Sequence, residues 1–247
     1  VHSGSASGVV PSPFRLLNKL ISRLEDSDTG KIDLENLNVE IPDERKAQAL
    51  EMVECLGNWE EEFPWYGNTK PSTSDSYESM LNRTWRPTMT VIGIDGIPPI
   101  KDGGNVLLPF SAANLSFRLP PTADSNKAMQ EVEKTLLSNP PNSCEVSIKW
   151  DKTANGWNAP SCKPWLNDTI NESSKEIFGK PARAMGEGGT IPFMAMLGER
   201  YPQAQFVITG VLGPNSNAHG PNEFIHIPFA KRLNTCIALI LSNFQKN

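Results

Sequence analysis

The sequence predicts an α/β protein in which an α+β domain, residues 1–160, is followed by an α/β portion, residues 161–247. Two patterns predict this division. In the first part, helical and strand-like segments follow one another in the order helix, strand, strand, helix, strand. After Gly156, helical and apolar segments alternate, which is typical of an α/β layer. The 247 residues are enough for one large domain or two small ones.

The first helix is expected at residues 12–26. It opens with Ser-Pro, a capping hydroxyl followed by the residue that suits the first helical position, and leucines then recur at three- and four-residue spacing. Residues 34–87 are more complex. Residues 43–56 and 76–85 have helical patterns, and the loop between them is rich in Pro, Gly and Ser. We interpret residues 34–87 as an enlargement of a smaller domain.

Three strands are expected in the same domain, at residues 88–96, 113–121 and 144–151. The first is rich in β-branched residues, and the other two alternate apolar and polar side chains. A helix at residues 125–139 separates the last two. With the first helix, these elements make most of a ferredoxin-like β-α-β-β-α-β sandwich. Its missing first strand would end at about Val1, so we expect the chain to continue upstream.

The second portion contains three expected helices, at residues 163–180, 191–202 and 228–244. A short strand is expected at residues 182–190, running into glycines, and a strongly apolar strand at residues 204–213. We place the domain boundary near residue 160, where the pattern changes.

Composition excludes several classes of protein. The hydrophobic content of 38% and the charged content of 21% are typical of a folded globular chain. The net charge is −5, from 23 basic and 28 acidic residues without a basic block, so we expect no nucleic-acid partner. No apolar run approaches the roughly 20 residues that a membrane helix needs. Four scattered cysteines, none in C-x-x-C spacing, favour reduced thiols and a cytoplasmic location.

His219 is the first candidate for chemistry. It lies in residues 213–224, where Gly, Pro and Asn exclude both helix and strand. A loop histidine is most often a plain surface residue. This one stands between an apolar strand and a helix, and ligands of α/β sheets gather at the carboxyl ends of strands, so it is a candidate zinc ligand. Its local partners are Glu223 and His226, and we expect His226, flanked by apolar residues, to pack against the fold.

The sequence GEGGTIP is the second candidate. It contains Glu187, Gly188, Gly189 and Thr190. The two glycines allow close approach of the backbone to a ligand, and the helix that follows presents N–H groups that attract a carboxylate. The alternative is an ordinary turn from strand to helix.

Arg118 is the third candidate, on the strand face opposite Leu115, Phe117 and Leu119. Taken alone, it is more simply a solvated or ion-paired arginine than a fork for a substrate carboxylate. His2 is uninformative by itself.

The order of these motifs is more informative than any one of them. HSG, SFRLPP, KPWL, GEGGTIP and NAHGPNE, in this order, resemble the zinc-dependent aminopeptidase/carboxypeptidase/aminoacylase family, and within it the carnosinase-type dipeptidases. The resemblance spans nearly the whole chain. It implies that residues 1–160 are a ferredoxin-like lid that forms a homodimer, and that residues 161–247 are the C-terminal portion of a catalytic domain. It also implies two zinc ions in the full-length enzyme, with H-x-D and the catalytic Glu-Glu pair upstream of this chain.

The resemblance also implies roles for individual residues. His219 matches a zinc ligand, and Arg118 matches the lid arginine that grips the substrate's C-terminal carboxylate. His2 matches the lid histidine that reaches into the partner subunit's site and steadies the tetrahedral oxyanion. Asn105 is a weaker candidate for a polar substrate contact. The family segment that holds the same end of the substrate through its backbone and a hydroxyl is matched by Glu187, Gly188, Gly189 and Thr190. Relatives often carry Arg where this chain has Gly186.

The implied reaction is hydrolysis of a dipeptide or of a C-terminal peptide bond by metal-activated water. This chain would supply the substrate-side groups and one zinc ligand, and we expect it to be inactive alone. The alternative is a non-catalytic ferredoxin-like dimerisation or ligand-binding module.

Overall fold

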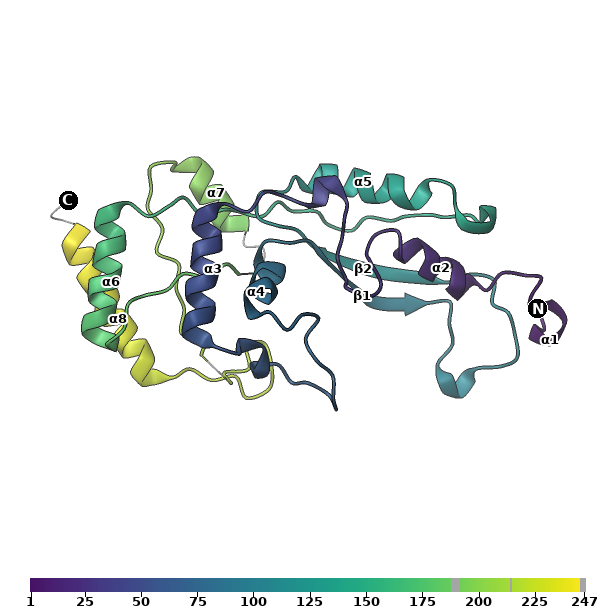
Figure 1. The fold of residues 1–247 in the computed structure, drawn as a ribbon, viewed down its shortest axis with the longest axis horizontal. Coiled ribbons are helices and arrows are strands. Elements are labelled where there is room, and N and C mark those ends of the chain that lie inside the picture. The colour runs from purple at the N-terminus through teal and green to yellow at the C-terminus, as the bar shows by residue number, and fades with distance from the viewer. Residues whose placement is uncertain (188–191, 214, 245–247) are drawn as a thin grey trace. The chain divides into compact units, whose positions relative to one another are not determined.

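The structure is a computed structural model that describes residues 1–187, 192–213 and 215–244. The chain divides into two compact units (Figure 1). The first contains residues 1–46, 71–157 and 186–192, and the second contains residues 47–70, 158–185 and 193–247. The boundary near residue 160 and the enlargement at residues 34–87 stay predictions.

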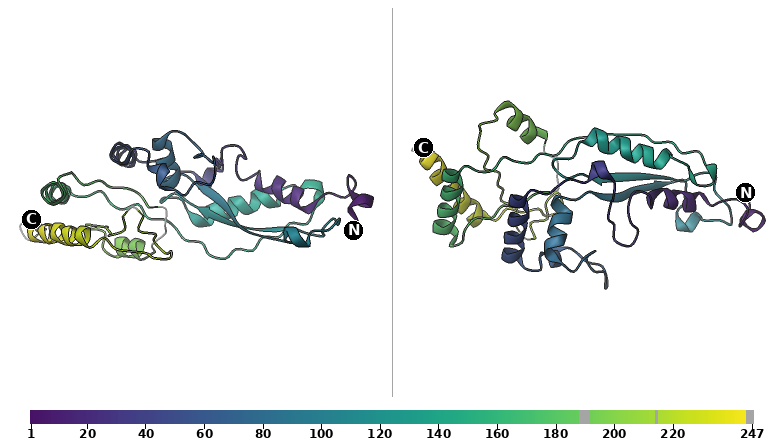
Figure 2. Two further views of the ribbon diagram at one scale, coloured as in Figure 1. Left: turned by 90° about the horizontal axis from the view of Figure 1, so that it is seen from below. Right: turned by 45° about the horizontal axis from the view of Figure 1, so that its top comes forward.

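An antiparallel hairpin forms the sheet of the first unit (Figure 2). Strand β1 (Thr88–Asp95) pairs with β2 (Ala112–Arg118), from Thr88 opposite Arg118 to Asp95 opposite Ala112, with an irregularity between Val91 and Gly93. Both strands lie where the sequence predicts them. Met89, Leu115 and Phe117 pack on one face, as expected for alternating strand residues.

Helices cover this face of the hairpin. Helix α2 (Pro13–Ile21) begins with proline at its first position, although Ser12 makes no capping hydrogen bond with its side chain. Helix α5 (Ser125–Leu137) is capped by Asp124, which accepts from the backbone N–H groups of residues 126 and 127. The two helices and residues 32–37 share one buried cluster, consisting of Leu20, Leu24, Ile32, Leu37, Ala128, Val132 and Leu136. The core of this unit is therefore built from local apolar faces that the sequence shows directly.

Short helices complete the first unit. They are α1 (Ser3–Ala6), α4 (Ser76–Thr84), η1 (Glu35–Leu37), η3 (Ile100–Asp102) and η4 (Pro141–Ser143).

The strand expected at residues 144–151 is not a strand in the structure. Val146, Ile148 and Trp150 are half-buried against the core, while the residues between them are exposed, so the predicted alternation is present. The segment lacks a ladder because, in the described part of the chain, β1 and β2 are the only sheet strands and they pair with each other. The ferredoxin-like topology is therefore not confirmed, and what the structure has is a mixed fold of helices and a small sheet.

The second unit is helical. Its long helices are α3 (Asp43–Leu56), which begins in the first unit, α6 (Pro164–Phe178) and α8 (Ile227–Phe244), with the shorter α7 (Pro192–Arg200) and η2 (Trp59–Glu62). Helices α6 and α8 pack together through Trp165 on Phe244 and Phe178 on Phe229. Helix α6 ends at Gly179, whose φ of 75° is left-handed, a conformation that glycine adopts without strain.

The expected strands of the second unit are also absent. Residues 204–213 and 182–187 have no strand assignment, and Ile208 and Leu212 are exposed; residues 188–190 lie outside the described residues. A single strand without a paired neighbour is not stable, so the α/β layer predicted for residues 161–247 is wrong for this chain. No helix in the described ranges combines the length and hydropathy needed to cross a membrane.

Candidate functional site

His2 and Asn105 lie together at one end of the first unit. The backbone N–H of Ser3 donates to the Asn105 carbonyl at 2.9 Å, and His2 forms an isolated antiparallel bridge with Val106. Both candidate side chains are exposed. The identities of His2 and Asn105 do not predict that they lie together, because this contact depends on the path of residues 96–111 back to the N-terminus.

The His2 ring is held by its own turn. Its Nδ1 accepts a hydrogen bond from the Gly4 backbone N–H at 3.1 Å and thereby caps α1. When Nδ1 accepts, the neutral ring carries its proton on Nε2. The turn therefore leaves His2 with an Nε2–H group that can donate to an oxyanion.

Arg118 lies at the other end of the hairpin. It is the last residue of β2, opposite Thr88, and it is exposed while Phe117 and Leu119 pack toward the core. His2 pairs before β2 begins, so the whole of this 7-residue strand lies between the two side chains. At a rise of roughly 3.3 Å per residue, that is about 20 Å. The structure does not bring His2 and Arg118 together in one chain.

Glu187 contacts α4. Its Oε1 accepts from Arg83 Nη2 at 3.1 Å. The preceding Gly186 lies against Thr84, since a Cβ at Gly186 would come within 3.1 Å of the Thr84 Cβ. The other candidates of this segment, Gly188, Gly189 and Thr190, lie outside the described residues.

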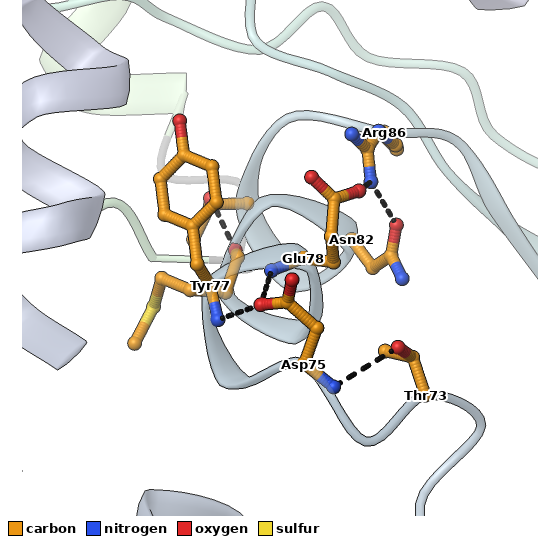
Figure 3. Close-up of polar contacts among 8 residues, drawn as sticks. Thr73, Asp75, Tyr77, Glu78, Asn82 and Arg86 are labelled. Carbon is orange, nitrogen blue, oxygen red and sulfur yellow. Dashed lines mark hydrogen bonds and ion pairs between the residues drawn. The ribbon is translucent and has the colours of Figure 1, made fainter. Parts of the chain in front are cut away.

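Helix α4 is anchored by polar contacts at both ends (Figure 3). Asp75 caps it by accepting from the N–H groups of Tyr77 and Glu78. At the other end, Arg86 Nη1 donates to Glu78 Oε2 at 2.6 Å and to Asn82 Oδ1 at 2.7 Å. These contacts fix the helix that carries Arg83. Nothing in the sequence pattern singles out Arg83, because its partner is 104 residues away.

His219 lies in the second unit, in a loop of left-handed residues. Its φ is 61°, and Asn215, Asn217 and Asn222 also have positive φ. The His219 backbone N–H donates to Glu223 Oε2 at 3.1 Å, so this carboxylate braces the loop. A histidine held in such a conformation is uncommon, and backbone strain of this kind gathers at functional sites.

His226 differs from the sequence-based expectation. It is exposed, and its Nδ1 accepts from the Phe229 N–H at 3.2 Å at the start of α8. It does not pack against the fold, because the first turn of the helix offers an unsatisfied N–H group that the ring can serve.

The family is decided by a comparison with known domains. The sequence pattern of the peptidase dimerisation domain, M20_dimer, matches residues 1–144. The chain belongs to this M20 peptidase family. This confirms the family that the five motifs predict.

Individual relatives agree with the family. The M20 chain is 26% identical over 257 residues to the cysteinylglycine-S-conjugate dipeptidase of Corynebacterium striatum, which covers 94% of this chain and 50% of the relative. Human carnosine dipeptidase 1 superposes with a TM-score of 0.72 at 20% identity, covering 99% of this chain and 52% of that one. The di-peptidase Dug1p of Saccharomyces cerevisiae gives a TM-score of 0.67 at 20% identity, with 100% and 52% coverage.

A carboxypeptidase has the same fold. The M20 family metallo-carboxypeptidase Sso-CP2 of Sulfolobus solfataricus gives a TM-score of 0.67 at 22% identity, covering 97% of this chain and 54% of that one. The M20 chain thus spans about half the length of the curated relative and of the solved structures that it matches.

The M20 family implies a metal cofactor, usually zinc, and the residues described for this chain do not hold one by themselves. Across residues 1–187, 192–213 and 215–244, no three His, Cys, Asp or Glu side chains gather closely enough to bind a metal ion. The loop carboxylate nearest to His219 in sequence is engaged by backbone. A catalytic zinc site takes three protein ligands, so His219 is at most one part of such a site.

Proposed function

We propose that this chain is the dimerisation region and an adjoining portion of a metallopeptidase that hydrolyses a dipeptide or a C-terminal peptide bond. In this proposal Arg118 binds the substrate carboxylate, and the segment Glu187, Gly188, Gly189 and Thr190 holds the same end of the substrate through its backbone and the Thr190 hydroxyl. His2 donates a hydrogen bond to the oxyanion in the partner subunit's site, Asn105 lies beside it, and His219 contributes one zinc ligand. Residues 1–160 are the lid, of ferredoxin-like topology, and residues 161–247 are the catalytic portion.

The observation that carries the proposal is the separation of His2 from Arg118. A dipeptide spans about 7 Å at most, since each residue extends the chain by at most about 3.6 Å. The 7-residue strand between the two side chains is about three times longer. One substrate molecule therefore does not contact both residues of a single chain, and a shared site requires two chains.

Mixing two inactive variants tests this arrangement. The test uses a polypeptide that contains both this chain and the family's metal-binding residues, and it is prepared as two variants, His2→Ala and Arg118→Ala. Each variant homodimer is expected to lose most of its activity on cysteinylglycine S-conjugates and carnosine. After subunit exchange, half of the dimers are mixed. Each mixed dimer has one site with an intact Arg118 and the partner's intact His2. Recovery to about a quarter of the wild-type activity is expected from this counting.

The control is a mixture of His2→Ala with a His2→Ala, Arg118→Ala double variant, in which no site is complete and no recovery is expected. Recovery in this control, or none in the first mixture, contradicts a role of His2 in the partner's site.

A second function fits the chain taken by itself, namely a non-catalytic dimerisation and ligand-binding module. The absence of a metal-binding group in the described ranges favours it. The purified chain of 247 residues is expected to bind zinc weakly and to hydrolyse neither substrate. Metal analysis after gel filtration is the measurement, with His219→Ala as control. Tight, stoichiometric zinc that this substitution removes contradicts the prediction. Cys55, Cys144, Cys162 and Cys236 form no disulfide among the residues that the structure describes, which supports a reducing, cytoplasmic location.

A further inference from the structure

Residues 186 and 187 are held against the last turn of α4. A Cβ at Gly186 would come within 3.1 Å of the Thr84 Cβ, so the backbone of this glycine lies directly on the helix. Beside it, Arg83 Nη2 donates to Glu187 Oε1 at 3.1 Å. All four residues belong to the first unit. The first residue of the proposed substrate-binding segment is therefore tied to α4 by an ion pair and by a close backbone contact.

Helix α4 is a firm support for this contact. Met80 and Leu81 are buried in the first unit, and so is Trp85 at the end of the helix. Thr84 Oγ1 donates to the Met80 carbonyl at 2.7 Å, and Arg86 donates to two side chains of the same helix (Figure 3). The helix that carries the ion-paired arginine is therefore held in place by core packing and by its own polar contacts.

The last turn of α4 lies at the same end of the hairpin as Arg118. Residues 85–87 lead from α4 to Thr88, which begins β1 and pairs with Arg118 at the end of β2 (Figure 1). Four residues of extended chain span at most about 14 Å, and paired residues of an antiparallel ladder lie about 5 Å apart. His2, by contrast, lies beyond the other end of β2. The structure therefore brings Glu187 and Arg118 to one end of the first unit.

An uncompensated carboxylate at this end would interfere with carboxylate binding. Glu187 has the same negative charge as the substrate's carboxylate, so it would compete for the Arg118 guanidinium and repel the substrate. The ion pair with Arg83 offsets this charge. Arg118 itself is exposed and, among the residues that the structure describes, takes part in no ion pair. The fold commits one arginine to Glu187 and leaves the other accessible.

We propose that Arg83 is a positioning residue for substrate binding. By pairing with Glu187 it keeps this carboxylate away from Arg118, so that Arg118 is left to the substrate's carboxylate. Arg83 thereby makes the site selective for peptides with a free C-terminal carboxylate over peptides that lack this charge. The inference rests on the proposed function, in which Arg118 binds that carboxylate.

Kinetics with two forms of the substrate test this role. The enzyme is the polypeptide that contains both this chain and the family's metal-binding residues, prepared as Arg83→Ala, Arg83→Lys, Arg118→Ala and the double variant Arg83→Ala, Glu187→Gln. The substrates are the dipeptides used to test the proposed function and the same dipeptides with the C-terminal carboxylate converted to the amide. Because the side chains of the Arg83–Glu187 pair are 35% and 65% exposed, their substitution is expected to leave the fold intact.

Arg83→Ala is expected to raise KM for the free carboxylate about fivefold, which is the effect that one exposed charge pair supports. KM for the amide and kcat for both forms should change by less than about twofold, because the contact is equal in the ground and transition states. Arg83→Lys should keep the low KM, since it keeps the charge. The double variant should return KM to within about twofold of the wild-type value, because the uncompensated charge at residue 187 is gone.

A merely structural role of the ion pair predicts different results. KM would then rise equally for carboxylate and amide, and Glu187→Gln would not restore it; either result overturns the proposal. An unchanged KM in Arg83→Ala, when Arg118→Ala raises it, also overturns the proposal and leaves the proposed function standing. An unchanged KM in Arg118→Ala overturns the proposed function, and this inference with it.

Lys46→Ala is the matched control. Lys46 Nζ lies 3.1 Å from Asp43 Oδ1 in the first unit, but this pair is local to the start of α3. KM for both forms of the substrate is expected to stay at the wild-type value. A rise equal to that of Arg83→Ala would show that the loss of any surface cation is enough, and it overturns the proposal.

Discussion

At the scale of single residues, the position of the His2 ring depends on a neighbour without a side chain. A Cβ at Gly4 would lie 2.9 Å from His2 Cε1, closer than such contacts occur. Gly4→Ala is therefore expected to displace the ring and break its bond to the residue 4 N–H. Because α1 has only 4 residues and His2 is exposed, the free energy of unfolding should change by less than about 1 kcal/mol.

Nitrogen chemical shifts of the imidazole measure this outcome. In the wild-type chain the neutral ring is expected to carry its proton on Nε2, and in Gly4→Ala it should become a mixture of both tautomers. Gly8→Ala is the matched control, since a Cβ at Gly8 meets no atom within 4 Å, although its φ of 86° adds local strain. An unchanged tautomer in Gly4→Ala would show that the turn does not hold the ring.

The predicted site residues show which features of a single position can be predicted from the sequence. Arg118 is on the exposed side of its strand, as the alternation of Leu115, Phe117 and Leu119 indicates. The side of the strand on which Arg118 lies follows from the alternation of side chains along a β-strand alone. Arg83, which contacts Glu187, leaves no such pattern, because an ion pair across 104 residues depends on the folded path of the chain. The roles of these residues stay predictions.

At the scale of elements, the helices were more predictable from sequence than the strands. Residues 43–56 form a helix with the predicted bounds, because a helical sequence pattern is a local property. Residues 144–151 and 204–213 have apolar patterns as strong as that of this helix, but neither segment forms a hydrogen-bonded strand pair. A strand needs a neighbour, and the neighbour is set by distant parts of the chain.

The contact between α6 and α8 makes a prediction about thiol reactivity. Cys236 of α8 is buried, and its Sγ donates to the Ser173 carbonyl of α6 at 3.5 Å. Burial, and then the nearby Glu176 carboxylate, raise the pKa of the Cys236 thiol above its ordinary value. A raised pKa lowers the thiolate fraction at every pH, and the thiolate is the reactive form.

Alkylation with iodoacetamide between pH 7 and 9, followed by mass spectrometry, checks this. The exposed Cys55 and Cys162 are expected to react at least tenfold faster than Cys236. Because the pKa of the Cys236 thiol is higher in the folded than in the unfolded state, its contribution to stability is fully present below the unfolded-state pKa. That contribution is lost as the pH rises through the folded-state pKa. Equal rates for Cys55 and Cys236 at pH 7 would mean that the two helices separate readily.

At the scale of the whole molecule, the first unit exposes several large apolar side chains to solvent. Val91, Ile92 and Ile94 of β1 are all exposed, and so are Ile100 and Phe110 in the segment between β1 and β2. Large exposed apolar areas on a folded protein mark interaction sites, and β1 also has an edge without a partner in the described chain. The M20 dimerisation domain covers all of these residues.

We therefore expect the chain to dimerise through the first unit at micromolar concentration, with β1 in the interface. Ile94, which is 53% exposed, is the position to change, because Ile94→Lys places a charge in an apolar contact. Sedimentation velocity should show a dimer for the wild type and at least a tenfold weaker association for Ile94→Lys. Tyr66→Lys is the matched control: Tyr66 is 92% exposed and belongs to the second unit, so its substitution should leave the dimer intact. A wild-type monomer at these concentrations would remove the physical basis for His2 acting in a partner's site, whereas a dimer that tolerates Ile94→Lys would move the interface away from β1.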